Sequence, residues 1–267
     1  LAKSEKISWY SGVHTMHQAI LMRADKNLEL AKSLSLRFLR SSSASLPPAV
    51  FEKLNRVFDC PVIEAYGMTE ATHQMTSNPL PPKKQKPGFV GIPSGPEVCI
   101  MNEDDKILNQ GKEGEVCIKG SNVTLGYENN PDANKSSFSN GWFRTGDQGY
   151  FDKDGYLKIS GRLKEIINKG GEKISPLEID NVLMNHPAIE QAVCFGYNDK
   201  MLGEDIATAI IVKEGKKCSE DEIKNYSKEK LAKFKIPKKI FFVNEIPKGA
   251  TGKLQRNVLA KSFGLNN

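Results

Sequence analysis

The sequence has no long apolar run, no Cys-x-x-Cys pair, and no repeated or low-complexity stretch among its 267 residues. Its longest apolar runs, such as residues 209–212, end after a few positions, whereas a membrane-spanning helix needs about 18 nearly uncharged residues. The five cysteines are odd in number and far apart, which argues against a disulfide framework. These absences predict a soluble protein with no membrane span, located in the reducing cytoplasm.

Neither composition nor charge indicates a nucleic-acid partner. Hydrophobic residues make up 39% of the chain and charged residues 26%, which is typical of a globular protein and excludes disordered and fibrous classes. The net charge of +6 is spread along the chain, and ten lysines between Lys213 and Lys239 are interleaved with acidic residues, as on a solvated surface. Attraction of the 3′-phosphate of CoA is a second interpretation of these lysines. RNA binding would require interleaved aromatic residues, so we predict no nucleic-acid partner.

The first 80 residues alternate between helical and strand patterns. Helical spacing covers 14–23, an alternating pattern covers 35–39, a helix that begins at a proline pair covers 47–58, and a buried strand covers 62–65. This alternation is typical of a doubly wound sheet, whose ligands bind beyond the carboxyl ends of the strands. Segments 40–44 and 66–69 would both lie at that edge.

The rest of the chain predicts a β subdomain and a second domain. Short β-like runs at 98–101, 115–119 and 156–159 are separated by glycine turns, with an Asp-Gly hairpin signal at 152–155, and indicate a small antiparallel sheet. Beyond Gly161-Arg162 we expect helix 176–185, strands 189–197 and 205–212, helix 219–231, strand 239–243 and a helix from about Leu254. The predicted fold class is therefore α/β: the end of a doubly wound sheet domain over 1–161, with an αβ region at 1–80 and a β subdomain at 81–161, followed by a C-terminal α+β lid domain over 162–267.

A hydroxyl and a carboxylate stand side by side just past the strand at 62–65. Thr69 and Glu70 follow Tyr66-Gly67-Met68, and this pair suits a nucleotide phosphate with its metal, because a hydroxyl can bond phosphate oxygens and Mg²⁺ takes oxygen ligands. Tyr66 would be free to stack on a base. The alternative is the start of a helix, with Thr69 as its cap and Glu70 favoured by the helix dipole. The residues alone leave both interpretations open.

Charged residues beside glycines mark two further segments. Asp147 lies between Gly146 and Gly149, where a carboxylate can accept both hydroxyls of a ribose, although an ordinary turn has the same pattern. Arg162 and Lys164 lie where the pattern of the chain changes, as expected either for a charged hinge that faces an anionic ligand or for a solvated linker.

A glycine-flanked lysine lies near the carboxyl end. The segment 248–253 reads Lys-Gly-Ala-Thr-Gly-Lys, but its glycines are three positions apart, and Leu254 stands where a phosphate-binding loop has the Ser or Thr that holds magnesium. It is therefore not a P-loop. Lys253 is either carried on an arm that delivers a cation to a phosphate or carboxylate, or located in a surface turn.

His14 and His17 have the spacing His-x-x-His. A metal site would need further Cys or His ligands nearby, and the sequence shows none, so we interpret both histidines as packed residues of a helix.

Taken together, the order and spacing of these motifs resemble the adenylate-forming acyl-CoA synthetase superfamily, which includes luciferase and 4-coumarate ligase. The resemblance runs from Trp9 to Phe263 and is greatest to the oxalyl-CoA synthetase branch. It is carried by the stretches 66–73 (YGMTEATH), 114–118 (GEVCI), 170–176 (GGEKISP) and 234–238 (FKIPK).

This resemblance implies a role for each candidate residue. For the nucleotide, Glu64, Ala65 and Tyr66 would line the adenine, Asp147 and Arg162 would hold the ribose, Thr69 would meet the AMP phosphate and Glu70 would hold Mg²⁺. For the acid, Ser43 and His73 would bind the substrate, and Lys253 would bridge it to the α-phosphate. Lys164 would be a hinge, and Gly170 and Gly171 would line the pantetheine tunnel.

The implied activity is that of an ATP-dependent acyl-CoA ligase, which forms acyl-AMP and then acyl-CoA from a small polar acid such as oxalate, with Mg²⁺ as cofactor and ATP and CoA as co-substrates. The family's Ser/Thr/Gly-rich phosphate loop has no counterpart in these residues, so we expect the chain to be a carboxyl-terminal half that is inactive by itself. Three alternatives remain: a non-catalytic module that binds AMP or CoA, an adenylation domain that loads a carrier protein, and a ligase for fatty or aryl acids.

Overall fold

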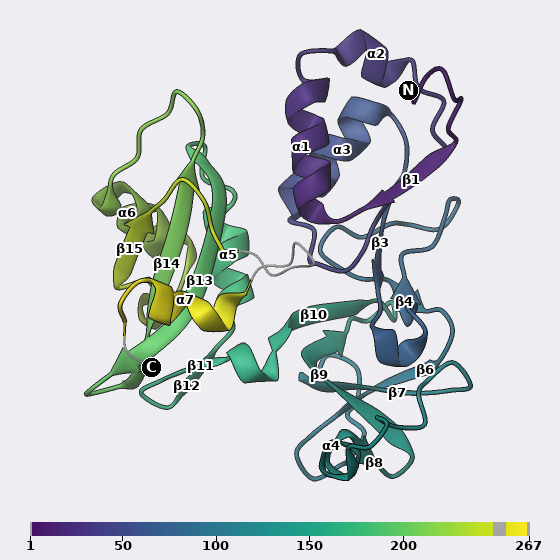
Figure 1. The fold of residues 1–267 in the computed structure, drawn as a ribbon, viewed down its shortest axis with the longest axis vertical. Coiled ribbons are helices and arrows are strands. Elements are labelled where there is room, and N and C mark those ends of the chain that lie inside the picture. Colours follow the sequence, from purple (N-terminus) through teal and green to yellow (C-terminus); the bar gives the residue numbers. More distant parts are fainter. Residues whose placement is uncertain (1, 248–254, 266–267) are drawn as a thin grey trace. The chain divides into compact units, whose positions relative to one another are not determined.

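The protein is described by a computed structural model over residues 2–247 and 255–265, and it divides into two compact units, Leu1–Ile159 and Ser160–Asn267 (Figure 1). Each unit has a hydrophobic core of its own. Within the described residues, no helix is both long enough and apolar enough to cross a membrane.

The first unit begins with a parallel sheet. Strands β1 (Trp9–Gly12), β2 (Phe38–Ser41) and β3 (Val62–Tyr66) pair in parallel, and β4 (Thr76–Ser77) and β5 (Ile92–Pro93) extend the sheet in antiparallel fashion. Helices α1 (His14–Ala24), α2 (Leu28–Lys32) and α3 (Pro48–Phe58) connect the parallel strands. Parallel strands joined by helices confirm the predicted doubly wound arrangement, and they bring the carboxyl ends of β2 and β3 to one edge.

The helices form where the sequence pattern predicts them, but α1 buries a different face from the one expected. Helix α3 begins at a proline and ends at Asp59, which adopts a left-handed backbone with φ of 49°, and its buried residues Phe51, Leu54 and Val57 recur every three positions. Helix α1 also forms, but Met16, which the spacing placed among the packed residues, is 55% exposed. His17 is buried on the inner face instead, so the packing role predicted for this histidine is confirmed.

A small antiparallel sheet completes the first unit, as predicted. Its strand order is β10-β9-β7-β6, with β8 (Phe138–Ser139) added to β9. The strands are β6 (Glu97–Met101), β7 (Gly114–Lys119), β9 (Trp142–Phe151) and β10 (Leu157–Arg162), and a short helix, α4 (Pro131–Ser137), precedes β8. The predicted hairpin turn is present between β9 and β10, where Gly155 has φ of 77° and its N–H donates to the Asp152 carbonyl at 3.0 Å.

The turn interpretation of the segment around Asp147 is wrong. The whole segment is the ten-residue strand β9, which pairs with β7. The glycine pattern reflects a bulge in that strand: Gly146 has φ of 74°, and the pairing register shifts between Glu115 and Cys117 of β7. A glycine that permits a bulge looks in sequence like a glycine that permits a turn.

The second unit is a sheet with a core on each face. Strands β11 (Ile167–Lys169), β12 (Glu172–Ile174), β13 (Ile189–Asp199) and β14 (Gly203–Val212) pair in the order β12-β11-β14-β13, and β15 (Lys239–Phe242) adds to β14 in parallel. Ala192 and Cys194 pack with residues of α5 (Pro176–Leu183) and α6 (Glu220–Lys230). Val193 and Phe195 pack on the other face with α7 (Arg256–Ser262). This alternation explains the continuous apolar run of β13.

Candidate functional site

The chain leaves β3 through a turn that is closed by its own backbone. The His73 N–H donates to the Met68 carbonyl at 3.0 Å and the Met75 N–H to the Tyr66 carbonyl at 2.9 Å. A Cβ on Gly67 would lie 1.3 Å from the carbonyl oxygen of His73. Only glycine therefore fits at this position, and its requirement comes from the close approach of two backbone segments.

Two of the predicted nucleotide residues meet beside this turn. Tyr66 ends β3, and its hydroxyl donates a hydrogen bond of 2.5 Å to the carboxylate of Asp147 on β9. Asp147 is 4% exposed, and its backbone N–H donates to the Thr145 hydroxyl at 3.1 Å. The structure thus connects two different sheets at one carboxylate.

The turn contains the predicted hydroxyl and carboxylate. Thr69 opens the short 3-10 helix η1 (Thr69–Ala71) and is exposed, while the residue before the helix is Met68 and no side chain caps it. The interpretation of Thr69 as a helix cap is therefore wrong, because the helix lasts one turn and begins at Thr69 itself.

Glu70 has a partner that the sequence did not reveal. The Tyr127 hydroxyl donates to the Glu70 carboxylate at 2.8 Å, and the pKa of Tyr127 is raised by burial and by this carboxylate. The Glu70 carbonyl also accepts the Thr124 N–H at 2.7 Å. The loop at 124–127 therefore fixes the direction in which Glu70 presents its second carboxylate oxygen, and long-range contacts of this kind have no signal in a single sequence.

The side chain of Glu64 faces the interior of the first unit. It is 3% exposed, and its two oxygens accept the backbone N–H groups of Leu46 at 3.2 Å and Gly88 at 3.0 Å. Burial raises the pKa of this carboxyl to about 8, although both hydrogen bonds favour the charged form. Ala65 is also buried. Only the backbone of this part of β3 can therefore face a nucleotide.

An arginine lies beside the predicted acid-binding histidine. Arg40, on β2, donates through Nη2 to Nε2 of His73 at 3.2 Å and to the Gln74 amide oxygen at 3.4 Å, and through Nη1 to the Ser11 hydroxyl at 3.2 Å. His73 is exposed in the turn, with φ of 84°. The strand pattern predicts segment 40–44 at this edge, but no motif marks Arg40 itself.

Ser43, the other predicted acid residue, lies in the loop that follows β2. It is exposed and has φ of 72°, so both acid candidates occupy left-handed backbone positions that few non-glycine residues adopt. In the part of the chain that the structure describes, Ser43 and His73 form no hydrogen bond with each other.

The other candidates belong to the second unit or lie outside the described residues. Arg162 ends β10, and Lys164 is exposed in the 3-10 helix η2 (Leu163–Glu165). Gly170 and Gly171 form the turn between β11 and β12, with φ of 58° and 92°. These positive φ values explain why the turn favours two glycines, and the Gly170 N–H donates to the Leu202 carbonyl at 2.8 Å. Lys253 lies outside the described residues.

A buried ion cluster holds the start of α7. Arg256 donates to the carboxylates of Asp180 at 2.8 Å and Glu165 at 3.0 Å, and also to the Cys194 carbonyl. Asp180 is 7% exposed and accepts the Cys194 N–H at 2.6 Å. This cluster connects η2, α5, β13 and α7. No sequence motif predicts it, because its members are far apart in the chain.

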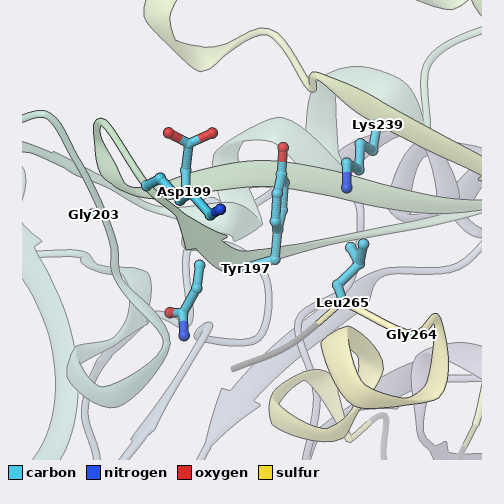
Figure 2. Close-up of a pocket in the computed structure, with 8 residues that line it drawn as sticks. Tyr197, Asp199, Gly203, Lys239, Gly264 and Leu265 are labelled. Carbon is cyan, nitrogen blue, oxygen red and sulfur yellow. The ribbon is translucent and has the colours of Figure 1, made fainter.

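The second unit contains a cavity of about 530 Å³ that is lined by residues other than the predicted site residues. Figure 2 shows Tyr197, Asp199 and Lys239 at this cavity, with Gly264 and Leu265 from the segment that follows α7. The Lys239 ammonium lies 4.6 Å from the centre of the Tyr197 ring. None of the predicted nucleotide, acid or CoA residues within the described chain lines this cavity, so we place the candidate site at the edge of β2 and β3 instead.

Metal-binding side chains are not clustered in the described residues: no group of three or more His, Cys, Asp or Glu side chains there is arranged to hold a metal ion. One carboxylate is nevertheless enough for Mg²⁺ that is bound mainly by phosphates and water. Glu70 fits that role, because Tyr127 occupies one of its two oxygens and leaves the other for a metal.

Comparison with known proteins gives consistent results. The AMP-binding enzyme family matches residues 1–128, and the C-terminal domain of AMP-binding enzymes matches residues 178–253. The chain is 52% identical to oxalate–CoA ligases from Arabidopsis thaliana and Saccharomyces cerevisiae, over 98% and 96% of its length. These matches cover 51% and 47% of the two relatives, so the chain spans about half the length of these curated relatives.

A solved structure has the same fold. ATP-bound MatB from Rhodopseudomonas palustris superposes with a TM-score of 0.90 and 31% sequence identity, over 97% of this chain and 51% of that one. The order of elements described above is therefore that of an adenylate-forming ligase.

Proposed function

This chain belongs to the AMP-binding enzyme family, among its acid–CoA ligases, and from that premise we propose that it is the carboxyl-terminal half of an enzyme that activates a small polar acid, with oxalate as the leading candidate. The observation that carries the proposal is the Tyr66–Asp147 hydrogen bond beside the turn that presents Thr69 and Glu70. Because the chain matches about half of its relatives, the activity proposed is that of the whole protein.

The nucleotide is proposed to lie against the end of β3. The backbone of Glu64 and Ala65 and the ring of Tyr66 line the adenine, and the Asp147 carboxylate accepts the hydroxyls of the ribose. The Tyr66 hydroxyl occupies one Asp147 oxygen and so holds the carboxylate in one orientation. Arg162 supplies a second ribose contact. Thr69 reaches the α-phosphate, and Glu70 holds Mg²⁺, which neutralises phosphate charge when it is bound.

The first half-reaction is the attack of the acid's carboxylate oxygen on the α-phosphorus. A P–O bond forms to the acid, the bond to pyrophosphate breaks, and acyl-AMP results. Charge builds on the non-bridging oxygens in the transition state, and a cation placed there lowers the barrier. We assign this cation to Lys253, on the strength of its glycine-flanked sequence position.

The second half-reaction is the attack of the CoA sulfur on the acyl carbonyl, with AMP as the leaving group. We propose that the second unit turns about Lys164 between the two half-reactions and that the Gly170-Gly171 turn then lines the path of the pantetheine arm. The division of the chain between Ile159 and Ser160 and the exposure of Lys164 support a hinge in this segment. Glycines suit the path because they leave room beside the backbone.

The acid is proposed to bind between Ser43 and His73. Both are polar and exposed at the edge of β2 and β3, with the Arg40 guanidinium beside His73. Burying these groups against an alkyl chain would leave polar atoms unpaired, at a cost of about 1–3 kcal/mol each. A short acid with a second polar group avoids that cost, which favours oxalate over fatty or aryl acids.

Exchange of radioactive pyrophosphate into ATP tests the proposal directly. We expect the full-length protein to catalyse exchange with oxalate, and to prefer oxalate to hexanoate and coumarate in kcat/KM. The 267-residue chain alone should give background exchange, since turnover requires neutralisation of the polyphosphate charge and the chain contains no loop for it. AMP binding by a full-length protein that catalyses no exchange with any acid would instead establish a non-catalytic binding module.

A further inference from the structure

We propose that Arg40 selects acids that carry a second negative charge, by pairing with that charge beside His73. This inference rests on the proposed ligase function and adds the residue that would set its substrate class. It concerns the first unit only, where Arg40 lies on β2 and His73 in the turn after β3.

The side chains that Arg40 contacts within the described residues are neutral. Its partners are the Ser11 hydroxyl, the Gln74 amide oxygen and Nε2 of His73. Because a guanidinium can only donate, Nε2 must accept, and the His73 proton in this contact lies on Nδ1. The ring therefore approaches Arg40 as an uncharged acceptor, and brings no balancing charge.

No carboxylate pairs with Arg40 among residues 2–247 and 255–265. Two other arginines do form ion pairs there: Arg144 pairs with Asp105 and Glu115, and Arg256 pairs with Asp180 and Glu165. Arg40 is half-buried, and burial lowers its pKa with no acidic neighbour to oppose the shift. A half-buried guanidinium without a counter-ion is well suited to pair with an anionic ligand.

The remaining donors of Arg40 suit a carboxylate. Three of its five N–H groups are used by the three contacts, which leaves two for a ligand in the part of the chain that the structure describes. They are Nε–H and one Nη1–H, which lie on different edges of the guanidinium, so each offers a carboxylate a single charge-assisted hydrogen bond. Arg40 therefore discriminates by the number of charges on the acid as well as by its size.

The position of Arg40 explains why a second carboxylate is needed. The reacting carboxylate must lie at the α-phosphate, which we assign to Thr69, four residues before His73 in the same closed turn. A simple monoacid has no further charge to present to Arg40. A short diacid places its second carboxylate a bond or two away from the first, and can satisfy both requirements.

The test compares two acids of nearly equal shape, oxalate and oxamate, in which an amide replaces one carboxylate. We would measure kcat/KM for pyrophosphate release with each acid in the full-length protein. The wild type should favour oxalate. Arg40→Met, which keeps the length of the side chain but removes its charge, should lower the oxalate-to-oxamate ratio at least about tenfold, and Arg40→Lys should give an intermediate ratio.

Arg37→Met is the matched control, since Arg37 is an exposed arginine three residues earlier. It should leave the ratio unchanged. A wild-type ratio in Arg40→Met, with turnover retained, would overturn the role of Arg40 and leave the ligase function standing. A wild type that turns over neither these nor any other acid would overturn the ligase function, and the inference with it. Thermal unfolding and AMP affinity equal to wild type in Arg40→Met would show that a lowered ratio arises at the acid.

Discussion

The hydroxyl of Tyr66 lies 2.5 Å from a carboxylate oxygen of Asp147, although the two residues are 81 positions apart. One ends a parallel strand and the other lies at a bulge in an antiparallel strand. The carboxylate proposed to hold a ribose is thus oriented by the residue proposed to stack on the attached base. One hydrogen bond thus links the two residues proposed to contact the nucleotide, and substitutions can separate their roles.

Asp147→Asn should weaken AMP binding by about 10- to 100-fold, because the variant loses charge-assisted hydrogen bonds to the ribose. Tyr66→Phe should cost less than about fivefold, since it keeps the ring and removes only the bond that orients Asp147. Titration calorimetry of the chain with AMP measures both effects. Tyr150→Phe, on the same strand as Asp147, is the control. Equal effects of the Asn and Phe variants would contradict the separate roles.

Gly67→Ala should destabilise the first unit by about 3 kcal/mol or more, because its Cβ would overlap the His73 carbonyl and force the turn apart. Gly155→Ala is a matched control: Gly155 has φ of 77° but open space around its Cβ position, so strain alone should cost about 1–2 kcal/mol. Urea unfolding of the two variants compares them. A Gly67→Ala variant as stable as Gly155→Ala would show that the turn is looser than its hydrogen bonds imply.

The buried carboxyl of Glu64 should make stability fall as pH rises. Its pKa is raised in the folded chain to about 8 from an ordinary value of 4.5, so between these two values the folded state keeps a proton that the unfolded state has lost. Relative to Glu64→Gln, the free energy of unfolding should therefore decrease by roughly 1.4 kcal/mol per pH unit within that window. Urea unfolding of both proteins from pH 5 to pH 8 checks the sign, and a difference that is constant with pH would refute it.

Arg256→Met should destabilise the second unit by about 3–5 kcal/mol, since it leaves the buried Asp180 without its partner. Glu165→Gln should cost much less, because the Glu165 side chain is 31% exposed. The exposed pair Lys224–Glu220 of α6 provides the control, and Lys224→Ala should cost about 0.5 kcal/mol or less. Amide hydrogen exchange of β13 and β14, measured in each variant and in the wild type, gives the three values.

In the full-length protein, Lys253→Ala should slow adenylation by about 10²- to 10³-fold and largely spare thioester formation from supplied acyl-AMP. Lys164→Pro should do the reverse, because proline fixes the φ angle about which we propose the second unit turns. The two half-reactions are measured separately, with Lys228→Ala, an exposed lysine on α6, as control. Equal loss in both half-reactions for either variant would contradict the proposed turn of the second unit between them.

Local patterns predicted most elements of this fold. The proline pair at 47–48 and the apolar spacing behind it predicted α3 to within a residue, and the buried run at 62–65 predicted β3. These succeeded because helix starts and buried strands are determined by nearby residues. The segment around Asp147 failed for the opposite reason, since its strand is defined by pairing with strands distant in sequence, such as β7.

The candidate site divides in the same way. Thr69, Glu70 and Asp147 could be proposed from the sequence because a hydroxyl and carboxylates beside glycines suit the chemistry of phosphate and ribose. Tyr127 and Arg40 could not be proposed in this way. Tyr127 is a candidate because it contacts Glu70, and Arg40 because it contacts His73, and both contacts form only in the folded chain. A charged residue within a strand at the ligand edge, as Arg40 is, was the one signal available for it.

The closed turn from Tyr66 to Met75 also limits how this region can change over evolutionary time. Its length is fixed by two backbone hydrogen bonds and by the fit of Gly67 against His73, so an inserted or deleted residue would break the turn that carries Thr69 and Glu70. If this region binds the acid as proposed, new acid preferences are expected to arise by exchange of side chains on a turn of constant length. A mutant library aimed at new substrates would vary positions 40, 43 and 73 and leave the length of the 66–75 turn unchanged.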